Sequence, residues 1–113
     1  MKATAKIEAG ICGFQTLAEA ATDDGQHVTF DIETMCEKIA LLGEVIEGKS
    51  PIDAYQEIRS FDTSVVLQAA RQTLTGCCAG CVVPVGLFKV LQVAAGLALP
   101  KEIHLTLTEG NQA

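Results

Sequence analysis

A hairpin turn, Asp23-Asp24-Gly25, limits the fold more than any other feature of this sequence. After the turn, residues 26–34 alternate polar and apolar side chains, which is typical of a half-buried β-strand. Before the turn, residues 14–22 have some helix propensity, but the turn favours a strand that pairs with the one after it. The sequence therefore predicts an antiparallel hairpin on either side of this turn.

The length of the turn loop sets which residues of the two strands face each other. A three-residue loop opposes small residues to large ones, for example Ala18 to Phe30, which favours cross-strand packing. Continued to the ends of the strands, the same register places Cys12 opposite Cys36. A two-residue loop would shift the register by one residue and remains an alternative.

The remaining elements are predicted from alternation and from helix start signals. Residues 4–11 form a first strand, and residues 102–108 alternate again and form a last one. Four helices are predicted: from the Thr34/Glu37 capping box to Gly48, from Pro51 to about Ile58, from Thr63 (capped by Asp62) to about Leu74, and from Pro84 to about Leu99. The order β-β-β-α-α-α-α-β predicts an α+β, two-layer fold with a mostly antiparallel sheet and helices on one face.

Length and charge set limits on organisation and partners. The 113 residues are expected to form a single domain over 1–113, with residues 109–113 as a frayed tail. The net charge of −6 argues against nucleic acid and anionic membrane as partners. Residues 79–99 are apolar enough to approach a membrane span, but Lys89 and Gln92 inside them favour a core helix. No signal peptide is recognised, so a cytoplasmic location with reduced cysteines is expected.

Four of the five cysteines lie at predicted helix starts. Cys36 falls in the first turn of the first helix, and Cys77, Cys78 and Cys81 come just before the helix that starts at Pro84. The N-terminal end of a helix favours negative charge, so we expect these thiols to lose their protons readily. The hairpin register adds the fifth, Cys12, and the sequence predicts that the cysteines converge.

A convergent cysteine cluster is typical of a soft-metal site. Thiolates bind zinc and iron–sulfur clusters, and four of them complete the ligand shell. Cys78 and Cys81 form a C-x-x-C half, and Cys12 with Cys36 would form the other half. Cys77 would be a fifth thiol or would replace Cys78 as ligand. The leading prediction is a protein that binds a soft metal or an iron–sulfur cluster.

Two alternatives stay open at this point. Cys78 and Cys81 have the local layout of a dithiol redox motif. In the second alternative, the cysteines are small buried residues of a non-enzymatic interaction domain, which forms a homo-oligomer or binds another protein. Whether the protein is an enzyme stays undecided, and no catalytic residue is assigned.

Four further side chains bear on the site. His27 and His104 are expected on the surface, away from the cysteines, whereas Arg71 and Lys89 are candidate cations beside the thiolates.

Three cysteine-containing segments stand out together: ICGF at residues 11–14, TMCEKI at 34–39, and CCAGCVVPVG at 77–86. This combination resembles a small uncharacterised family found mainly in anaerobic archaea and bacteria. The family has no assigned activity, so the resemblance implies no catalytic residues. Its anaerobic context implies that iron–sulfur chemistry is a reasonable expectation for the cysteines.

Overall fold

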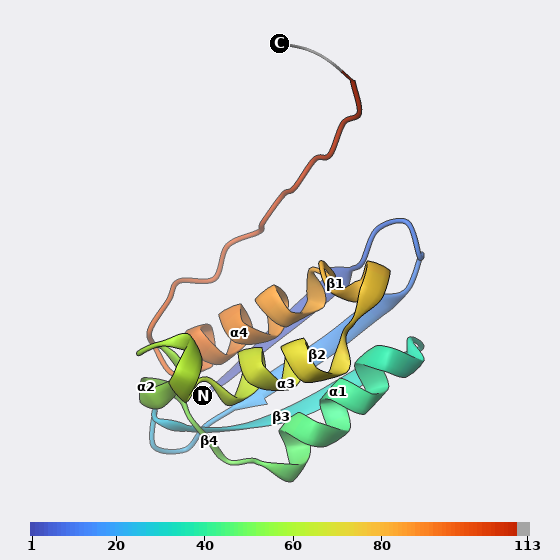
Figure 1. Ribbon diagram of the computed structural model, residues 1–113. Coiled ribbons are helices and arrows are strands. Elements are labelled where there is room, and N and C mark those ends of the chain that lie inside the picture. The colour runs from blue at the N-terminus through green and yellow to red at the C-terminus, as the bar shows by residue number, and fades with distance from the viewer. Residues whose placement is uncertain (111–113) are drawn as a thin grey trace.

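The computed structural model describes residues 1–110 and confirms the α+β class, with strands first and helices after them. The elements in order are β1 (Lys2–Glu8), β2 (Gln15–Ala21), β3 (His27–Thr34), α1 (Glu37–Gly48), β4 (Ile52–Asp53), α2 (Ala54–Glu57), η1 (Phe61–Thr63), α3 (Val65–Thr73), η2 (Gly76–Cys78) and α4 (Val83–Ala94). Here η denotes a 3-10 turn. The four strands form one antiparallel sheet in the order β1-β2-β3-β4, and the helices cover one of its faces (Figure 1).

The hairpin between β2 and β3 is present, but its register differs from the prediction by two residues. Ala20 lies opposite Phe30 and Ala18 opposite Ile32, so small residues still oppose large ones. A shift of two keeps every side chain on its predicted face. The reason is a longer turn, since the strands end at Ala21 and resume only at His27. Cys12 and Cys36 lie outside both strands, so the predicted cross-strand pair does not form.

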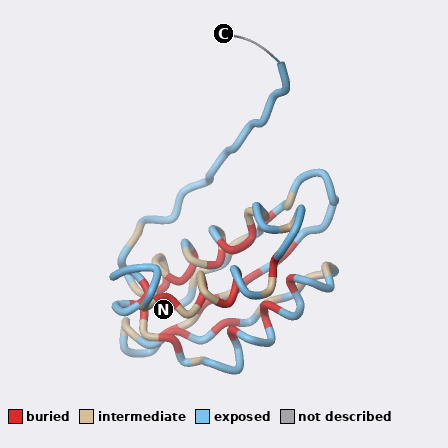
Figure 2. The backbone as a smooth tube through the Cα atoms, in the orientation of Figure 1, coloured by how far each residue is buried: buried red, intermediate tan, exposed pale blue. Residues whose placement is uncertain are grey.

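The core lies between the sheet and the helices (Figure 2). Helix α4 packs against β1 and β2, α1 packs against β3, and α3 contacts both helices. The largest fully buried side chains are aliphatic and come from every layer, among them Ile39, Leu42, Ile46, Ile52, Leu87 and Leu91. Within residues 1–110, the stretch Gly76–Ala94 has the length and composition of a membrane span, a property that core helices share. Its α4 part packs against the sheet here.

The starts of two helices differ from the prediction. Residues after Pro51 form the short strand β4, and Asp53 caps α2 by accepting hydrogen bonds from the N–H groups of Tyr55 and Gln56. Helix α3 begins one residue after Ser64, whose hydroxyl accepts a hydrogen bond from the N–H of Leu67 at 3.0 Å. Asp62, the predicted cap, lies in η1 instead. In each case a nearer side chain satisfies the free N–H groups of the first turn.

The C-terminal segment corrects two further expectations. Helix α4 ends at Ala94, before the predicted Leu99, because Gly96 adopts a φ of 76° and the N–H of Leu97 turns back to the carbonyl of Gln92. Residues 102–108 are extended and exposed but pair with no strand, so the predicted last strand is wrong for this chain alone. An alternating pattern of polar and apolar residues indicates a strand, but it does not show that a sheet edge lies beside the segment to pair with it. Of the predicted frayed residues 109–113, the last three lie outside the described part of the chain.

Candidate functional site: a cysteine cluster

Three chain segments that carry cysteines meet at one end of the molecule. They are the β1–β2 loop with Cys12, the start of α1 with Cys36, and the α3–α4 connection with Cys77, Cys78 and Cys81. Figure 1 shows these segments at the same end, opposite the β2–β3 turn. The arrangement follows from topology, since β1 and β2 connect at this end and both α1 and α4 begin there.

The β1–β2 loop presents Cys12 at an exposed tip. Gly10 and Gly13 both have positive φ angles, 95° and 77°, which only glycine adopts without strain. The N–H of Gly13 donates to the carbonyl of Gly10 at 2.9 Å, and the N–H of Ala9 donates to that of Phe14 at 3.1 Å. These bonds close the loop at its base and leave the Cys12 side chain in solvent.

Cys36 is the N-cap residue of α1 rather than a residue of its first turn. The predicted Thr34/Glu37 capping box is absent, because the Thr34 hydroxyl accepts a hydrogen bond from the N–H of Cys36 at 3.1 Å. The same hydroxyl also accepts a hydrogen bond from the hydroxyl of buried Thr16 at 3.0 Å. Cys36 is half-buried against the core, held at the sheet end by this pair of threonines.

The α3–α4 connection places its three cysteines in different surroundings. The N–H of Cys78 donates to Thr75 at 3.2 Å and the N–H of Cys81 donates to Cys78 at 3.1 Å, so the segment forms two consecutive turns. Cys78 and Cys81 are half-buried and pack against the core, whereas Cys77 is exposed. The two adjacent cysteines are therefore not equivalent.

The electrostatics of Cys81 show which thiols lie near it. Burial raises the pKa of the Cys81 thiol, and the negative charges of Cys12, Cys36 and Cys78 raise it further against a hydrogen bond from the N–H of Val83. All three segments thus lie within electrostatic reach of Cys81. The direction is opposite to the sequence expectation for this residue, because desolvation and like charges outweigh the helix terminus.

A lysine that sequence reasoning did not select completes the cluster. The ammonium group of Lys38 lies 3.6 Å from the sulfur of Cys78 and can donate a hydrogen bond to it. Arg71 and Lys89, which the sequence offers only as candidates, have no such contact with a cysteine sulfur. The available signal was the position of Lys38 in the first turn of α1, two residues after Cys36.

The thiols lie at the same end of the molecule without forming a bonded array. All five cysteines are free. Within residues 1–110, no three Cys, His, Asp or Glu side chains stand in positions that would hold a metal ion without movement. The four-cysteine cluster, defined here as Cys12, Cys36, Cys78 and Cys81, is therefore a gathering of thiols rather than a preformed ligand shell.

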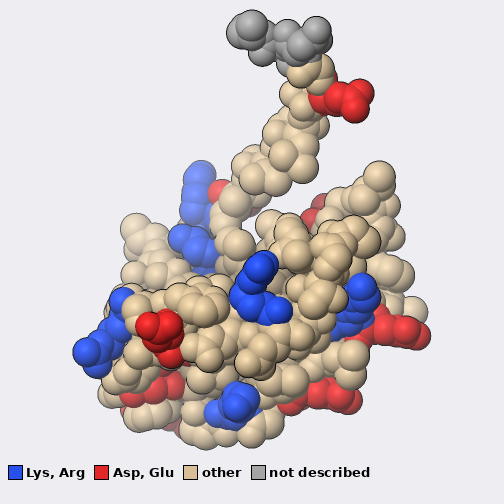
Figure 3. Space-filling model, in the orientation of Figure 1, with Lys and Arg blue, Asp and Glu red and all other residues tan. Residues whose placement is uncertain are grey.

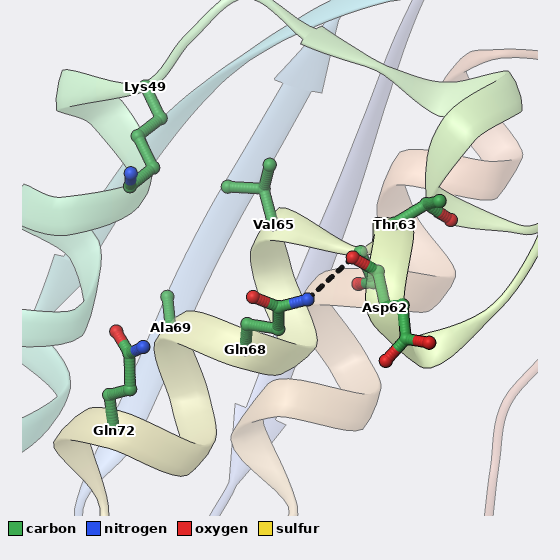
Figure 4. A pocket seen from close by; sticks show the side chains of 8 residues that line it. Lys49, Asp62, Thr63, Val65, Gln68, Ala69 and Gln72 are labelled. Atoms are coloured by element: carbon green, nitrogen blue, oxygen red, sulfur yellow. Dashed lines mark hydrogen bonds between the residues drawn. The ribbon is translucent and has the colours of Figure 1, made fainter.

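Other polar features lie away from this cluster. A hollow of about 140 Å³ is lined by residues of η1 and α3 and by Lys49 (Figure 4). Its Gln68 amide donates to the carbonyls of Phe61 and Asp62, so the side chain is committed to holding η1. A second hollow contains His27, which is exposed as expected, and His104 is exposed on the C-terminal segment. Figure 3 shows acidic and basic side chains mixed on the face in view.

Comparison with known proteins identifies the family and nothing more specific. A family model described as a family of unknown function (DUF6951) matches residues 3–107. No curated protein and no solved structure matches the chain. Because the match covers nearly the whole chain, the protein belongs to this family, in agreement with the expected resemblance to an uncharacterised one.

Proposed function

We propose that this member of an uncharacterised family binds a soft metal, zinc or an iron–sulfur cluster, through its cysteines. The observation that carries the proposal is that three cysteine-bearing chain segments meet at one end of the molecule, where the charges of Cys12, Cys36 and Cys78 act on Cys81. Packing alone does not explain why free thiols from three chain segments gather at one surface. Four thiolates, in contrast, complete the shell of a structural zinc site or a cluster.

The proposed ligands are Cys12, Cys36, Cys78 and Cys81, and Cys77 is excluded. Cys78 packs against the core and contacts Lys38, whereas the side chain of Cys77 is exposed and is not among the charges that act on Cys81. The Lys38 ammonium would offset part of the negative charge that four thiolates bring. We therefore propose Cys78, and not Cys77, as the ligand from this adjacent pair.

Binding would require the thiols to move closer, and the chain offers a segment that allows it. Cys12 lies on a loop bounded by Gly10 and Gly13, and its neighbour Ile11 is fully exposed, so packing does not oppose movement of the loop. A bound cation would also offset the negative charges of Cys12, Cys36 and Cys78, which add to burial in raising the pKa of Cys81. A cation would therefore stabilise the deprotonated form of these thiols, and this stabilisation is the chemical basis of the proposal.

Replacing the two adjacent cysteines one at a time tests the ligand assignment. We expect Cys78→Ser to weaken zinc binding at least tenfold, as expected when one ligand of a thiolate shell is lost, and Cys77→Ser to leave it unchanged. Zinc affinity would be measured by competition with a chromophoric chelator under reducing conditions. Equal affinities for both variants would contradict the ligand assignment, and a wild-type protein that binds neither zinc nor iron would contradict the proposal.

A thiol redox pair is the second candidate function, and the contact of the Lys38 ammonium with Cys78 favours it. A redox pair needs one thiol with a lowered pKa as nucleophile. Burial raises the pKa of Cys81, so Cys78 would have to take that role. If Cys78 and Cys81 nevertheless form a disulfide on mild oxidation, zinc affinity should fall in parallel, and the same chelator competition reports it.

A further inference from the structure

The C-terminal segment, residues 102–108, has the pattern of a strand but no partner. Its apolar residues Ile103, Leu105 and Leu107 alternate with polar ones and are 60%, 72% and 85% exposed. Figure 1 shows the segment running away from the domain, and Figure 2 shows it exposed along its length. A row of large apolar side chains in water is unusual for a soluble chain and marks a surface that a partner covers.

The sheet has a free edge of matching length. Strand β1 is the outermost strand, with seven residues, and pairs only with β2 among the described residues. Met1 and Thr22 exchange both of their backbone hydrogen bonds, so the odd-numbered residues of β1 face β2. The N–H and C=O groups of the even-numbered residues, from Lys2 to Glu8, therefore point outward and are available to another strand.

We propose that residues 102–108 of one chain add as a strand to the β1 edge of a second copy. The exchange is reciprocal, so the two copies form a closed dimer with two-fold symmetry. This inference rests on the tail and the sheet edge, and it does not depend on the cysteine cluster.

The side chains of the two segments are complementary when the strands run parallel. With Glu102 beside Lys2, the odd-numbered tail residues lie on the face of Ala3, Ala5 and Ile7, where α4 covers the sheet. Ala3 and Ala5 are only half-buried in the monomer, so the tail would complete their cover. An antiparallel strand of the same length would place Glu102 beside Glu8, which like charges disfavour.

A second copy is the occupant that the structure favours. The tail leaves the end of α4 and extends away from its own β1, which positions it to reach another molecule (Figure 1). The family match, which runs from residue 3 to residue 107, covers β1 except Lys2 and the tail segment except Thr108, so both belong to the family pattern. Exchange of one element between identical chains is a low-cost route to a dimer.

Light scattering on the full chain, coupled to size exclusion, tests the proposal. The wild type is expected to elute at about twice 11.9 kDa. Leu105→Asp, which places a charge on the covered face, is expected to give a monomer. Its matched control, Thr106→Asp, adds the same charge one residue later on the outer face and is expected to stay dimeric.

A second variant tests the sheet edge. Thr4→Pro removes an N–H that points away from β2, so it blocks strand addition and leaves the β1–β2 pairing intact. Both this variant and Leu105→Asp should be monomers alone. Mixed together they should form a heterodimer, because one retains the edge and the other retains the tail.

Hydrogen exchange separates the remaining outcomes. A wild-type monomer with fast-exchanging tail amides would overturn the proposal. A monomer with protected tail amides would mean that the tail docks on its own β1, which also overturns it. A dimer that survives both Leu105→Asp and Thr4→Pro would show that the copies meet elsewhere.

Discussion

At the scale of single residues, the β2–β3 turn is organised by one carboxylate. Asp24 accepts hydrogen bonds from the N–H groups of Gln26 and His27, each at 2.8 Å, and its second oxygen lies 2.8 Å from Nδ1 of His27. The N–H of His27 is the largest cause that holds the pKa of Asp24 below its ordinary value. The sequence identifies this turn. It does not show how many residues the hydrogen bonds of the Asp24 carboxylate will span, so the predicted register differs from the observed one by two residues.

This contact predicts a pH dependence. The hydrogen bond with Asp24 raises the pKa of His27 above 6.5, so its stabilising effect is complete below pH 6.5 and disappears as the pH rises through the folded-state pKa. NMR titration should place His27 above 6.5 in the wild type and lower in Asp24→Asn. An unchanged His27 titration in that variant would exclude the pairing.

A second residue-scale prediction concerns Glu57, which is 2% exposed. Its carboxylate accepts hydrogen bonds from the N–H groups of Val65 and Val66 and from the hydroxyl of Ser64, so it holds the start of α3. Glu57→Gln replaces an acceptor oxygen with a donor and should reduce the free energy of unfolding by about 1–3 kcal/mol. Urea denaturation measures this. Glu44→Gln on the exposed side of α1 is the control and should change little.

At the scale of elements, α4 approaches β1 closely at Gly86. A Cβ atom there would lie 2.5 Å from Cδ1 and 2.8 Å from Cγ1 of Ile7, inside van der Waals contact. At Gly43 in α1, in contrast, the nearest atoms of Ile32 would be 3.6 Å away, which is an ordinary contact. Gly43 and Gly86 therefore differ in the space available for a side chain, although no sequence pattern distinguishes them.

The two alanine variants should change stability in opposite directions. Overlap with Ile7 costs about 1–3 kcal/mol in Gly86→Ala, and the better helix propensity of alanine returns only about 1 kcal/mol. Gly43→Ala gains the propensity without the overlap and should be more stable by up to about 1 kcal/mol. The thermal unfolding temperatures of both variants, compared with the wild type, test this prediction. A stabilised Gly86→Ala would show that the Ile7 side chain moves aside at little energetic cost.

Elements also show where sequence reasoning succeeds. Alternation identified the faces of β2 and β3 correctly, because the two-residue period survives an error in register. Helix starts were less accurate, since Ser64 rather than Asp62 caps α3, and α1 has no side-chain cap although Thr34 and Glu37 have the spacing of a capping box. The segment 102–108 was read as a strand although no edge lies beside it in the monomer, and the strand-exchange dimer would supply that edge.

At the scale of the whole molecule, the meeting of the cysteines follows from topology more than from register. The predicted Cys12–Cys36 pairing depended on a ladder that ends before both residues. The segments still meet, because the β1–β2 loop and the starts of α1 and α4 lie at one end (Figure 1). The different burial of Cys77 and Cys78, and the contact of Lys38 with Cys78, depend on side-chain positions that no spacing rule gives.

The metal content of the wild-type protein, purified without oxygen and without added metal, tests the central claim most directly. We expect about one zinc, or up to about four irons with broad visible absorption, per chain. The same preparation of Cys81→Ser should lose the metal. A folded wild-type protein with no bound metal and five freely reacting thiols would contradict the account.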